Sequence, residues 1–431
     1  MTFFDRRLET LSRQELGDLQ LAKLAALLEV VFGSNRFYTD KMRAAGVTPG
    51  DIRSLEDMTR LPLTTKLELA NAAEADPPYG TNLTFPETEY TRIHQTSGTT
   101  GKPLRVFDTE EDWNWWGRCW AYVLSGAGLT AVDRLFLPFS FGPFIGFWAA
   151  LEGARQIGAL LVPGGGATSA QRAYLMGEHG VTAMCCTPTY ALRLADVARS
   201  EGVDPVSLAL RTIITAGEPG GNVPAVKQRI EAAWGAKVFD HAGASEVGPH
   251  SFECEPQPGG THPIETEYIV EVLDGATQEP VAPGEMGELV ITGLGRLGFP
   301  AIRYRTGDLV RLNNEPCVCG RTFARFEGGV LGRADDMIIV RGVNIFPDAI
   351  EDLVRQVDAV EEYQITVSKG TDLARLAVSI EVAEGADPDD TSALVTKSLR
   401  NVLGLSPVVS VAPSESLPRF ELKARRFHVV D

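Results

Sequence analysis

The chain has 431 residues, more than one ordinary hydrophobic core accommodates, so two or more domains are expected. Its apolar content of 44% and charged content of 23% are those of a soluble globular protein. The formal net charge of −17 argues against nucleic acid and anionic membranes as partners, because both reward clustered Lys and Arg. No basic stretch followed by an apolar one opens the sequence, which predicts a cytoplasmic protein.

The first 75 residues or so are predicted to be mostly helical. Apolar residues recur at helical spacing over residues 11–32. Residues 64–68, with the sequence Thr-Thr-Lys-Leu-Glu, are typical of a helix start.

From about residue 90 to residue 331, short apolar runs alternate with helical segments. The runs predicted to be buried strands are residues 135–137, 159–162, 183–186 and 212–215. This alternation indicates an α/β fold with a mostly parallel sheet covered by helices. Residues 267–273 and 287–292 predict strands of a more antiparallel region.

A domain boundary is predicted near Gly332, after a glycine-rich turn. The roughly 100 residues beyond it have their own pattern, enough for a small separate domain. Strands are predicted at residues 337–340 and 376–382, and an amphipathic helix at residues 347–357. We therefore expect a large α/β domain over residues 1–331 and a small α+β lid domain over residues 332–431.

Residues 96–103, Thr-Ser-Gly-Thr-Thr-Gly-Lys-Pro, combine hydroxyls, glycines and one lysine. Glycines let the backbone turn tightly and approach a ligand closely, while hydroxyls, backbone N–H groups and the lysine supply donors and positive charge. The segment therefore predicts a phosphate-binding loop, although its spacing differs from that of the Walker loop. Taken alone, it is also compatible with a surface turn.

Further segments carry the remaining signals. Residues 215–219 run from a strand into a glycine-containing turn, where ligands of α/β sheets bind. Glu246 follows small residues and would suit Mg²⁺, which prefers oxygen ligands. Asp308, in Tyr-Arg-Thr-Gly-Asp, would accept hydrogen bonds from ribose hydroxyls. Residues 332–342 fall on the domain junction, where a hinge is expected. Taken alone, residues 215–219 are also compatible with a plain turn and residues 332–342 with a charged linker. The alternative for Glu246 is an exposed glutamate, and the alternative for Asp308 is a turn aspartate.

The six cysteines fall into two groups. Those in apolar segments, which indicate buried inert thiols, are Cys119, Cys185 and Cys186. Cys254, Cys317 and Cys319 lie in polar loops, and His262 follows Cys254 by eight residues. Three Cys and one His would complete a closed, structural zinc site, although a CxC spacing is less diagnostic than CxxC.

In order and spacing, these segments resemble the adenylate-forming superfamily of acyl-CoA synthetases, and within it the phenylacetate-CoA ligase family, from about residue 5 to the C-terminus. Residues 341–347 and the cysteine pair before Gly320 are typical of that family, and in some relatives the pair helps to bind zinc. The nucleotide-binding residues that the resemblance implies are Ser97, Gly98, Thr99, Thr100 and Gly101 in the phosphate loop, Ala216, Gly217, Glu218 and Pro219 in the adenine-side turn, and Ser245, Asp308 and Arg333.

The catalytic residues that the resemblance implies are Lys102, Glu246 and Lys423, with Asp335 as the hinge pivot. Two positions depart from the family pattern. Ala242 stands where the family usually has a Tyr that stacks on adenine, and Leu422 stands before Lys423 where a Gly is usual. A solvated basic tail is the alternative for the Lys423 segment.

The resemblance implies two half-reactions. A carboxylate attacks the α-phosphate of ATP, giving an acyl-adenylate and pyrophosphate, and the CoA thiol then displaces AMP. Mg²⁺ on Glu246, the phosphate loop and Lys423 would stabilise charge around the phosphorus, and rotation about Asp335 would then remove Lys423.

An aromatic acid fits the family, and the aromatic residues 139–148 suggest its pocket, with Phe141 and Gly142 as candidate contacts. Ordinary core packing is the alternative for these rings. No residue chooses between phenylacetate, indoleacetate, hydroxybenzoate and aminobenzoate.

Two other functions stay open: an adenylating enzyme that loads a carrier-protein thiol, and a nucleotide-binding regulatory protein without catalysis. The residues that argue against the second are Lys102, Glu246, Asp308, Arg333 and Lys423. A homodimer is expected only because homodimers are the commonest oligomers.

Overall fold

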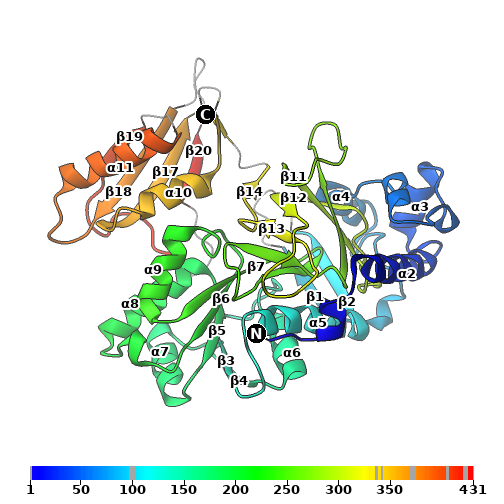
Figure 1. The fold of residues 1–431 in the computed structure, drawn as a ribbon, viewed down its shortest axis with the longest axis horizontal. Coiled ribbons are helices and arrows are strands. Elements are labelled where there is room, and N and C mark those ends of the chain that lie inside the picture. Colours follow the sequence, from blue (N-terminus) through cyan, green and yellow to red (C-terminus); the bar gives the residue numbers. More distant parts are fainter. Residues whose placement is uncertain are drawn as a thin grey trace.

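The structure of the protein is a computed structural model. It describes residues 2–96, 103–334, 338–340, 343–368, 375–403, 407–420 and 426–430. Figure 1 shows a large body, coloured from blue to yellow, and a smaller body in orange and red near the C-terminus. The predicted fold class, a large α/β domain followed by a small α+β domain, is confirmed.

Helices dominate the first 75 residues, as the sequence predicts. They are α1 (Arg6–Glu9), α2 (Arg13–Val31), α3 (Arg36–Ala44) and α4 (Lys66–Ala75), with the short 3₁₀ helices η1 (Pro49–Asp51) and η2 (Glu56–Arg60). Ser12 and Glu15 form a capping box that satisfies backbone N–H groups at the start of α2. Buried α2 residues such as Leu24 share one apolar cluster with Ile269 of the main sheet.

Along the chain, a β-hairpin lies between these helices and the strands of the main sheet. After η3 (Glu87–Glu89), strands β1 (Tyr90–Gln95) and β2 (Arg105–Thr109) pair antiparallel. The predicted phosphate loop is the connection between them. Helix α5 (Glu110–Gly126) follows β2 at once, and its tryptophans are buried in the largest apolar cluster of the described chain.

The parallel part of the main sheet has the order β4-β3-β5-β6-β7. Its strands are β3 (Arg134–Leu137), β4 (Leu160–Pro163), β5 (Ala183–Cys186), β6 (Thr212–Thr215) and β7 (Lys237–Ala244). The connecting helices are α6 (Trp148–Ile157), α7 (Ser169–Glu178), α8 (Pro188–Ser200), η4 (Pro205–Ser207) and α9 (Pro224–Trp234). The predicted apolar strands are confirmed, and β5 and β6 are buried along their whole length, as expected for parallel strands covered by helices.

The rest of the main sheet is antiparallel and continues from β7 in the order β8-β9-β13-β12-β11-β10. Its strands are β8 (Gly248–Glu253), β9 (Gly260–Pro263), β10 (Tyr268–Leu273), β11 (Met286–Gly293), β12 (Tyr304–Asn313) and β13 (Arg325–Glu327), with β14 (Gly332–Arg333) paired to β12. The two predicted antiparallel strands are confirmed. The sheet as a whole is mixed rather than mostly parallel, because the connections after β7 are too short to hold a crossover helix.

The small domain follows β14. It comprises β15 (Ile338–Val340), β16 (Val343–Ile345), α10 (Pro347–Arg355), β17 (Val360–Ser368), β18 (Arg375–Val382), α11 (Pro388–Leu403), β19 (Val408–Val411) and β20 (Phe427–Val430). Its four-stranded sheet has the order β19-β18-β17-β20. The backbone N–H of Ala225 in α9 donates to Asp352 Oδ1 in α10 at 2.9 Å, which joins the two domains where Figure 1 draws these helices together.

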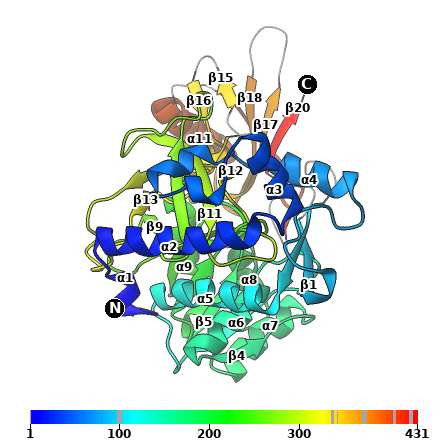
Figure 2. The same ribbon diagram turned by 90° about the vertical axis from the view of Figure 1, so that its right-hand side faces the viewer.

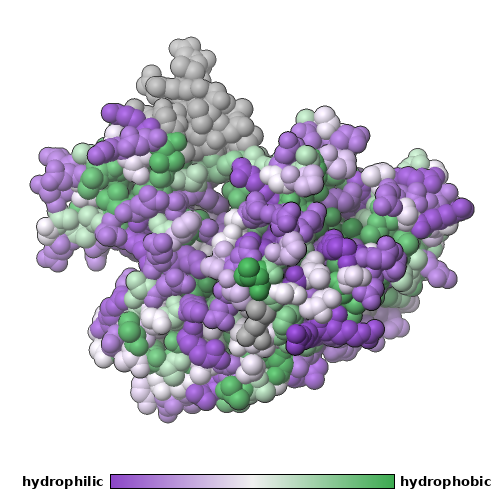
Figure 3. All heavy atoms as spheres, viewed as in Figure 1, coloured by the Kyte–Doolittle hydropathy of each residue, from purple (hydrophilic) through white to green (hydrophobic). Residues whose placement is uncertain are grey.

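The view in Figure 2 shows α2 lying across one side of the large domain, with strands of the small domain above it. On the face drawn in Figure 3, polar residues predominate and apolar residues form small scattered patches. Within the described residues, no helix combines the length and the apolar character needed to cross a membrane.

Candidate active site

The carboxyl end of β6 lies beside the middle of β7, since Thr215 pairs with Asp240. The predicted adenine-side turn follows β6, and Gly217 has a φ of 93°, a conformation that favours glycine. Glu218 Oε1 accepts a hydrogen bond of 2.8 Å from the backbone N–H of Thr189, in the first turn of α8. The turn containing Ala216 and Pro219 therefore follows a strand that neighbours β7, and β7 leads on to the turn with Glu246.

Glu246 lies in the tight turn between β7 and β8, next to Ser245. Its side chain is only 6% exposed and forms an ion pair with Lys66, whose Nζ lies 3.0 Å from Oε1. Burial raises the pKa of Tyr304, the first residue of β12, and the neighbouring Glu246 carboxylate raises it further. A buried carboxylate oxygen beside a nucleotide site is suited to a divalent cation.

The predicted ribose motif and the start of the predicted hinge segment are paired. Asp308 lies opposite Arg333 where β12 meets β14, and Arg333 Nη1 lies 3.0 Å from Asp308 Oδ1. The same nitrogen donates to the carbonyl of Thr306 at 3.1 Å. Gly307 has a φ of 75°, and a Cβ there would lie 2.7 Å from Arg333 Nη2, so glycine permits this close approach.

Hydrogen bonds between Thr96 and Leu104 close the base of the predicted phosphate loop. Thr96 donates its backbone N–H to the carbonyl of Leu104 at 2.9 Å, and Leu104 donates to Thr96 Oγ1 at 3.0 Å. Gln95 donates to the carbonyl of Pro143 at 2.8 Å, which joins the hairpin to the aromatic segment after β3. The predicted site residues outside the described chain are Ser97, Gly98, Thr99, Thr100, Gly101, Lys102, Asp335 and Lys423.

The segment after β3 forms an aromatic cluster. The Phe141 ring contacts Trp148 edge-on, with centroids 4.8 Å apart, and Phe139 at 5.2 Å. Trp148 Nε1 donates to the carbonyl of Gly142 at 3.0 Å. Phe141 and Gly142 are partly exposed. His94 lies 6.2 Å from Trp148, and its burial lowers the pKa of this histidine to about 4, so it is neutral at pH 7.

A second cluster lies where β8, β9 and the loop before β13 meet. Cys254, His262, Cys317 and Cys319 are buried, and their ligand atoms all lie within 4.8 Å of one another. The Cys254 and Cys317 sulfurs are 3.6 Å apart, and Cys319 Sγ is 3.5 Å from His262 Nε2. These spacings fit the edges of a zinc tetrahedron, which are about 3.8 Å for Zn–S bonds of about 2.3 Å.

The ionisable groups of this cluster are coupled, since the hydrogen bond between Cys254 and Cys319 raises the pKa of Cys254 and lowers that of Cys319. Hydrogen bonds from Cys254 and His262 lower the pKa of Cys319. Burial opposes charge on His262, but its hydrogen bonds to Cys317 and Cys319 raise its pKa to about 9 in the metal-free state. His262 Nδ1 lies 2.9 Å from the carbonyl of Ala324, which directs Nε2 toward the sulfurs, an arrangement typical of zinc-binding histidines.

The sequence interpretation missed three charged residues around Glu246. Lys66 appeared only as part of a helix start, although its side chain pairs with Glu246. Arg296 donates to the carbonyls of Ser245 and Glu246 and pairs with Asp108. No local pattern distinguishes Asp108, which stands in a short strand between Phe107 and Thr109.

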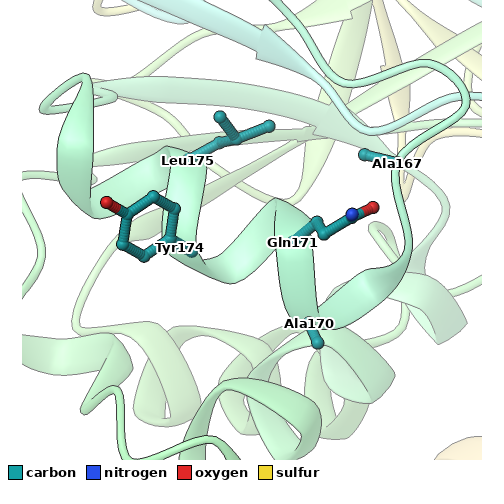
Figure 4. A pocket seen from close by; sticks show the side chains of 5 residues that line it. All are labelled: Ala167, Ala170, Gln171, Tyr174 and Leu175. Atoms are coloured by element: carbon teal, nitrogen blue, oxygen red, sulfur yellow. The ribbon is translucent and has the colours of Figure 1, made fainter.

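An open hollow of about 520 Å³ lies on α7, and Figure 4 shows its side chains Ala167, Ala170, Gln171, Tyr174 and Leu175. None of them is a predicted site residue, and Tyr174 is the single titratable group among them. The hollow therefore offers no arrangement for catalysis.

Comparisons with known proteins show the family of this chain. A sequence model of the AMP-binding enzyme family matches residues 53–296, and one of the AMP-binding enzyme C-terminal domain matches residues 342–431. The phenylacetate-coenzyme A ligase of Thermus thermophilus is 35% identical over 384 residues, which cover 88% of this chain and 84% of the relative.

Solved structures give the same result. The crystal structure of 2-hydroxyisobutyryl-CoA ligase in the postadenylation state, in complex with R3-HIB-AMP, superposes with a TM-score of 0.93 at 31% identity, covering 99% of this chain and 91% of that one. The same enzyme in the thioesterification state, in complex with 2-HIB-AMP and CoA, gives a TM-score of 0.75 at 31% identity, covering 98% and 91%.

Fold, site and comparisons together define an adenylate-forming enzyme, an acid–CoA ligase that works through an acyl-adenylate and releases AMP. Within this class, the chain belongs to the phenylacetate-CoA ligase family.

Proposed function

We propose that this ligase activates an aromatic carboxylic acid of the arylacetate or benzoate type. The observation that carries the proposal is the aromatic cluster around Phe141 and Trp148, which adjoins the phosphate-loop hairpin through the hydrogen bond between Gln95 and Pro143. Flat apolar walls favour a flat apolar acyl group. The neutral His94 beside Trp148 adds no charge to this wall.

In the adenylation step, a carboxylate oxygen of the acid attacks the α-phosphorus of ATP, and pyrophosphate leaves. Glu246 would hold Mg²⁺, which supplies neutralisation of phosphate charge. Residues 97–101 would bind phosphate oxygens, and Lys102 and Lys423 would stabilise the negative charge that develops around phosphorus. Asp308 would accept hydrogen bonds from the ribose, and residues 216–219 would border adenine.

In the second step, the CoA sulfur attacks the acyl carbonyl carbon, a C–S bond forms, and AMP leaves with the electrons of the C–O bond. Lys423 has no part in this step, so we expect rotation about Asp335 to carry it away first. Transfer to a carrier-protein thiol uses the same chemistry and is the alternative acceptor.

Pyrophosphate release across a panel of acids, with ATP and Mg²⁺ and with or without CoA, tests the proposal. The panel needs phenylacetate, indoleacetate, hydroxybenzoates, aminobenzoates and the aliphatic 2-hydroxyisobutyrate. We expect release with one aromatic acid, with CoA consumed and AMP formed. Preference for the aliphatic acid would refute the aromatic pocket, and release without CoA turnover would favour a carrier protein.

The assignment of Lys423 has its own test in the same assay. Lys423→Ala should abolish adenylation yet leave thioester formation from supplied acyl-adenylate intact, because the lysine serves only the first step. Retained adenylation would show that another residue fills this role.

We also propose that Cys254, His262, Cys317 and Cys319 hold a structural zinc ion. The support is the burial of all four residues, the separation of their ligand atoms by no more than 4.8 Å and the anchored His262 ring. A homodimeric state and a cytoplasmic location stay predictions.

A further inference from the structure

Arg296 is a charged side chain enclosed in the protein beside the candidate active site. Its side chain is 1% exposed, and its Nε lies 2.8 Å from Oδ1 of Asp108, which is 0% exposed. The guanidinium lies over the rings of Trp116 and Phe299, at 5.1 and 5.3 Å from their centroids. Both charges are removed from water and therefore depend on their contacts inside the protein.

The other donors of Arg296 are directed at main-chain oxygens from two segments. Nη1 donates to the carbonyls of Ser245 at 3.0 Å and Glu246 at 3.1 Å. Nη2 donates to the carbonyl of Phe107 at 3.3 Å. Phe107 and Asp108 belong to β2, whose hairpin with β1 carries the predicted phosphate loop. One planar group thus connects the Glu246 main chain to this hairpin.

Stability alone is a weak reason for this arrangement. Replacing a buried ion pair by apolar residues of similar volume is often neutral or stabilising. A guanidinium is instead suited to fixing several acceptors at once, because its donors form a rigid planar fork. At Arg296 the fork holds three carbonyls and one carboxylate.

We infer that Arg296, supported by Asp108, is a positioning residue that fixes the Glu246 main chain relative to the phosphate-loop hairpin. The inference rests on the proposed function, in which Glu246 and that loop act on the same triphosphate. The Glu246 main chain and the phosphate-loop hairpin then stay at a fixed distance from each other while the acid is activated. Positioning of this kind matters because a shift of about 1 Å can cost about 100-fold in rate.

The test compares Arg296→Met, Arg296→Lys and the double variant Asp108→Leu/Arg296→Met. Arg296→Met leaves the buried Asp108 carboxylate without its cation, with the hydrogen bond from Trp116 Nε1 remaining, so both thermal stability and activity should fall. The double variant removes both charges and should recover much of the stability. Its kcat should stay roughly 10- to 100-fold low and its KM for MgATP raised, because the carbonyls remain untethered, while KM for the acid stays unchanged. Arg296→Lys should be intermediate, since one ammonium replaces the fork.

A matched control is the pair Arg321 and Glu9, with side chains 1% and 0% exposed, which joins α1 to the loop after Cys319. The variant Glu9→Leu/Arg321→Met should leave KM for MgATP unchanged. Recovery of activity together with stability in the Asp108→Leu/Arg296→Met variant would refute the inference, as would an equal rise in KM in the control. MgATP binding by calorimetry gives a readout that needs no turnover, and an inactive wild-type enzyme would count against the proposed function instead.

Discussion

At the scale of single residues, the site is built from buried charges that each have a specific partner. Glu246 pairs with Lys66, and Arg296 pairs with Asp108 while holding the Glu246 carbonyl. Removing one partner of such a pair is costly because it leaves the other charge uncompensated. Substitutions here should therefore be made in pairs if activity is to be separated from folding.

The zinc proposal predicts that replacing a single cysteine sulfur causes the protein to lose its zinc ion. Cys317→Ser should lower the zinc content of the purified protein from about one ion per chain to near zero and should lower its thermal stability, because a structural site needs all four ligands. Metal analysis and thermal unfolding measure the two effects. Cys186→Ser is the control, since Cys186 is also buried but lies in a strand apart from the cluster. Metal-free wild-type protein of unchanged stability would contradict the proposal.

His250 predicts a pH dependence. Burial, together with the charge of His241, lowers the pKa of His250 from 6.5 to about 3. Between these values the unfolded chain binds a proton and the folded chain does not, so the stability that neutral His250 permits is present above pH 6.5 and is lost as pH falls.

Relative to His250→Gln, the wild-type free energy of unfolding should therefore drop by about 1.4 kcal/mol per pH unit below pH 6.5. Above pH 7.5 the free energies of unfolding of the wild type and of His250→Gln should differ by a constant amount. Urea unfolding at pH 7.5, 6.5 and 5.5 measures it, and a difference that does not change with pH would show that folding does not lower the pKa of His250.

At the scale of elements, α4 positions Lys66. Thr65 and Glu68 form a capping box at its start, and Thr64 exchanges backbone hydrogen bonds of 2.8 Å with Arg303 and Arg305, which flank the first residue of β12. The helix thus begins at a fixed point, with Lys66 as its first residue facing Glu246.

Thr65→Ala should lower the free energy of unfolding by about 1 kcal/mol, because the first turn loses its cap. Thr168→Ala on α7 removes an equivalent capping box and should cost a similar amount. Of the two variants, Thr65→Ala alone should also raise KM for MgATP, since α4 carries Lys66, the ion-pair partner of Glu246, and α7 does not contact Glu246 in this way. Equal kinetics in the two variants would mean that the start of α4 has no influence on the nucleotide site.

The elements themselves could be predicted because helical spacing and apolar runs are local properties of the sequence. The segments 216–219, 245–246 and 304–308 stand out because their residue order is typical of the family, and their roles stay predictions. The contacts of Arg296 could not be predicted, since Asp108 lies 188 residues away and the pairing depends on the whole fold. The antiparallel region is expected from residues 267–273 and 287–292, but the order of its strands is not, because that order depends on pairing partners distant in sequence.

At the scale of the whole molecule, the contact between domains has a polar component. Arg426 of the small domain forms a bidentate pair with Glu362 and donates to Thr189 Oγ1 of the large domain at 3.2 Å. The Thr189 backbone in turn donates to Glu218 of the adenine-side turn. This chain of contacts links the segment beside Lys423 to the candidate nucleotide site.

Thr189→Val should weaken this arrangement without unfolding either domain. We expect adenylation to slow a few-fold while thioester formation from supplied acyl-adenylate is unchanged, because the hydroxyl is lost only from the interface and Ala225 and Arg229 keep their contacts with the small domain. Single-turnover kinetics of each half-reaction measure the effect. Thr396→Val, in α11 of the small domain, is the control, since its hydroxyl bonds only within its own helix. Equal slowing of both half-reactions would contradict this interpretation.

The proposed zinc ligands also bear on how the chain is made. Cys254 and Cys317 are 63 residues apart, and they meet only when β8, β9 and β13 have paired. During synthesis, the ribosome must therefore extend the chain beyond Cys319 before the fourth ligand exists. If these residues hold zinc as proposed, the ion is captured late in the synthesis of the large domain, and a shortage of zinc would leave the antiparallel strands without this cross-link.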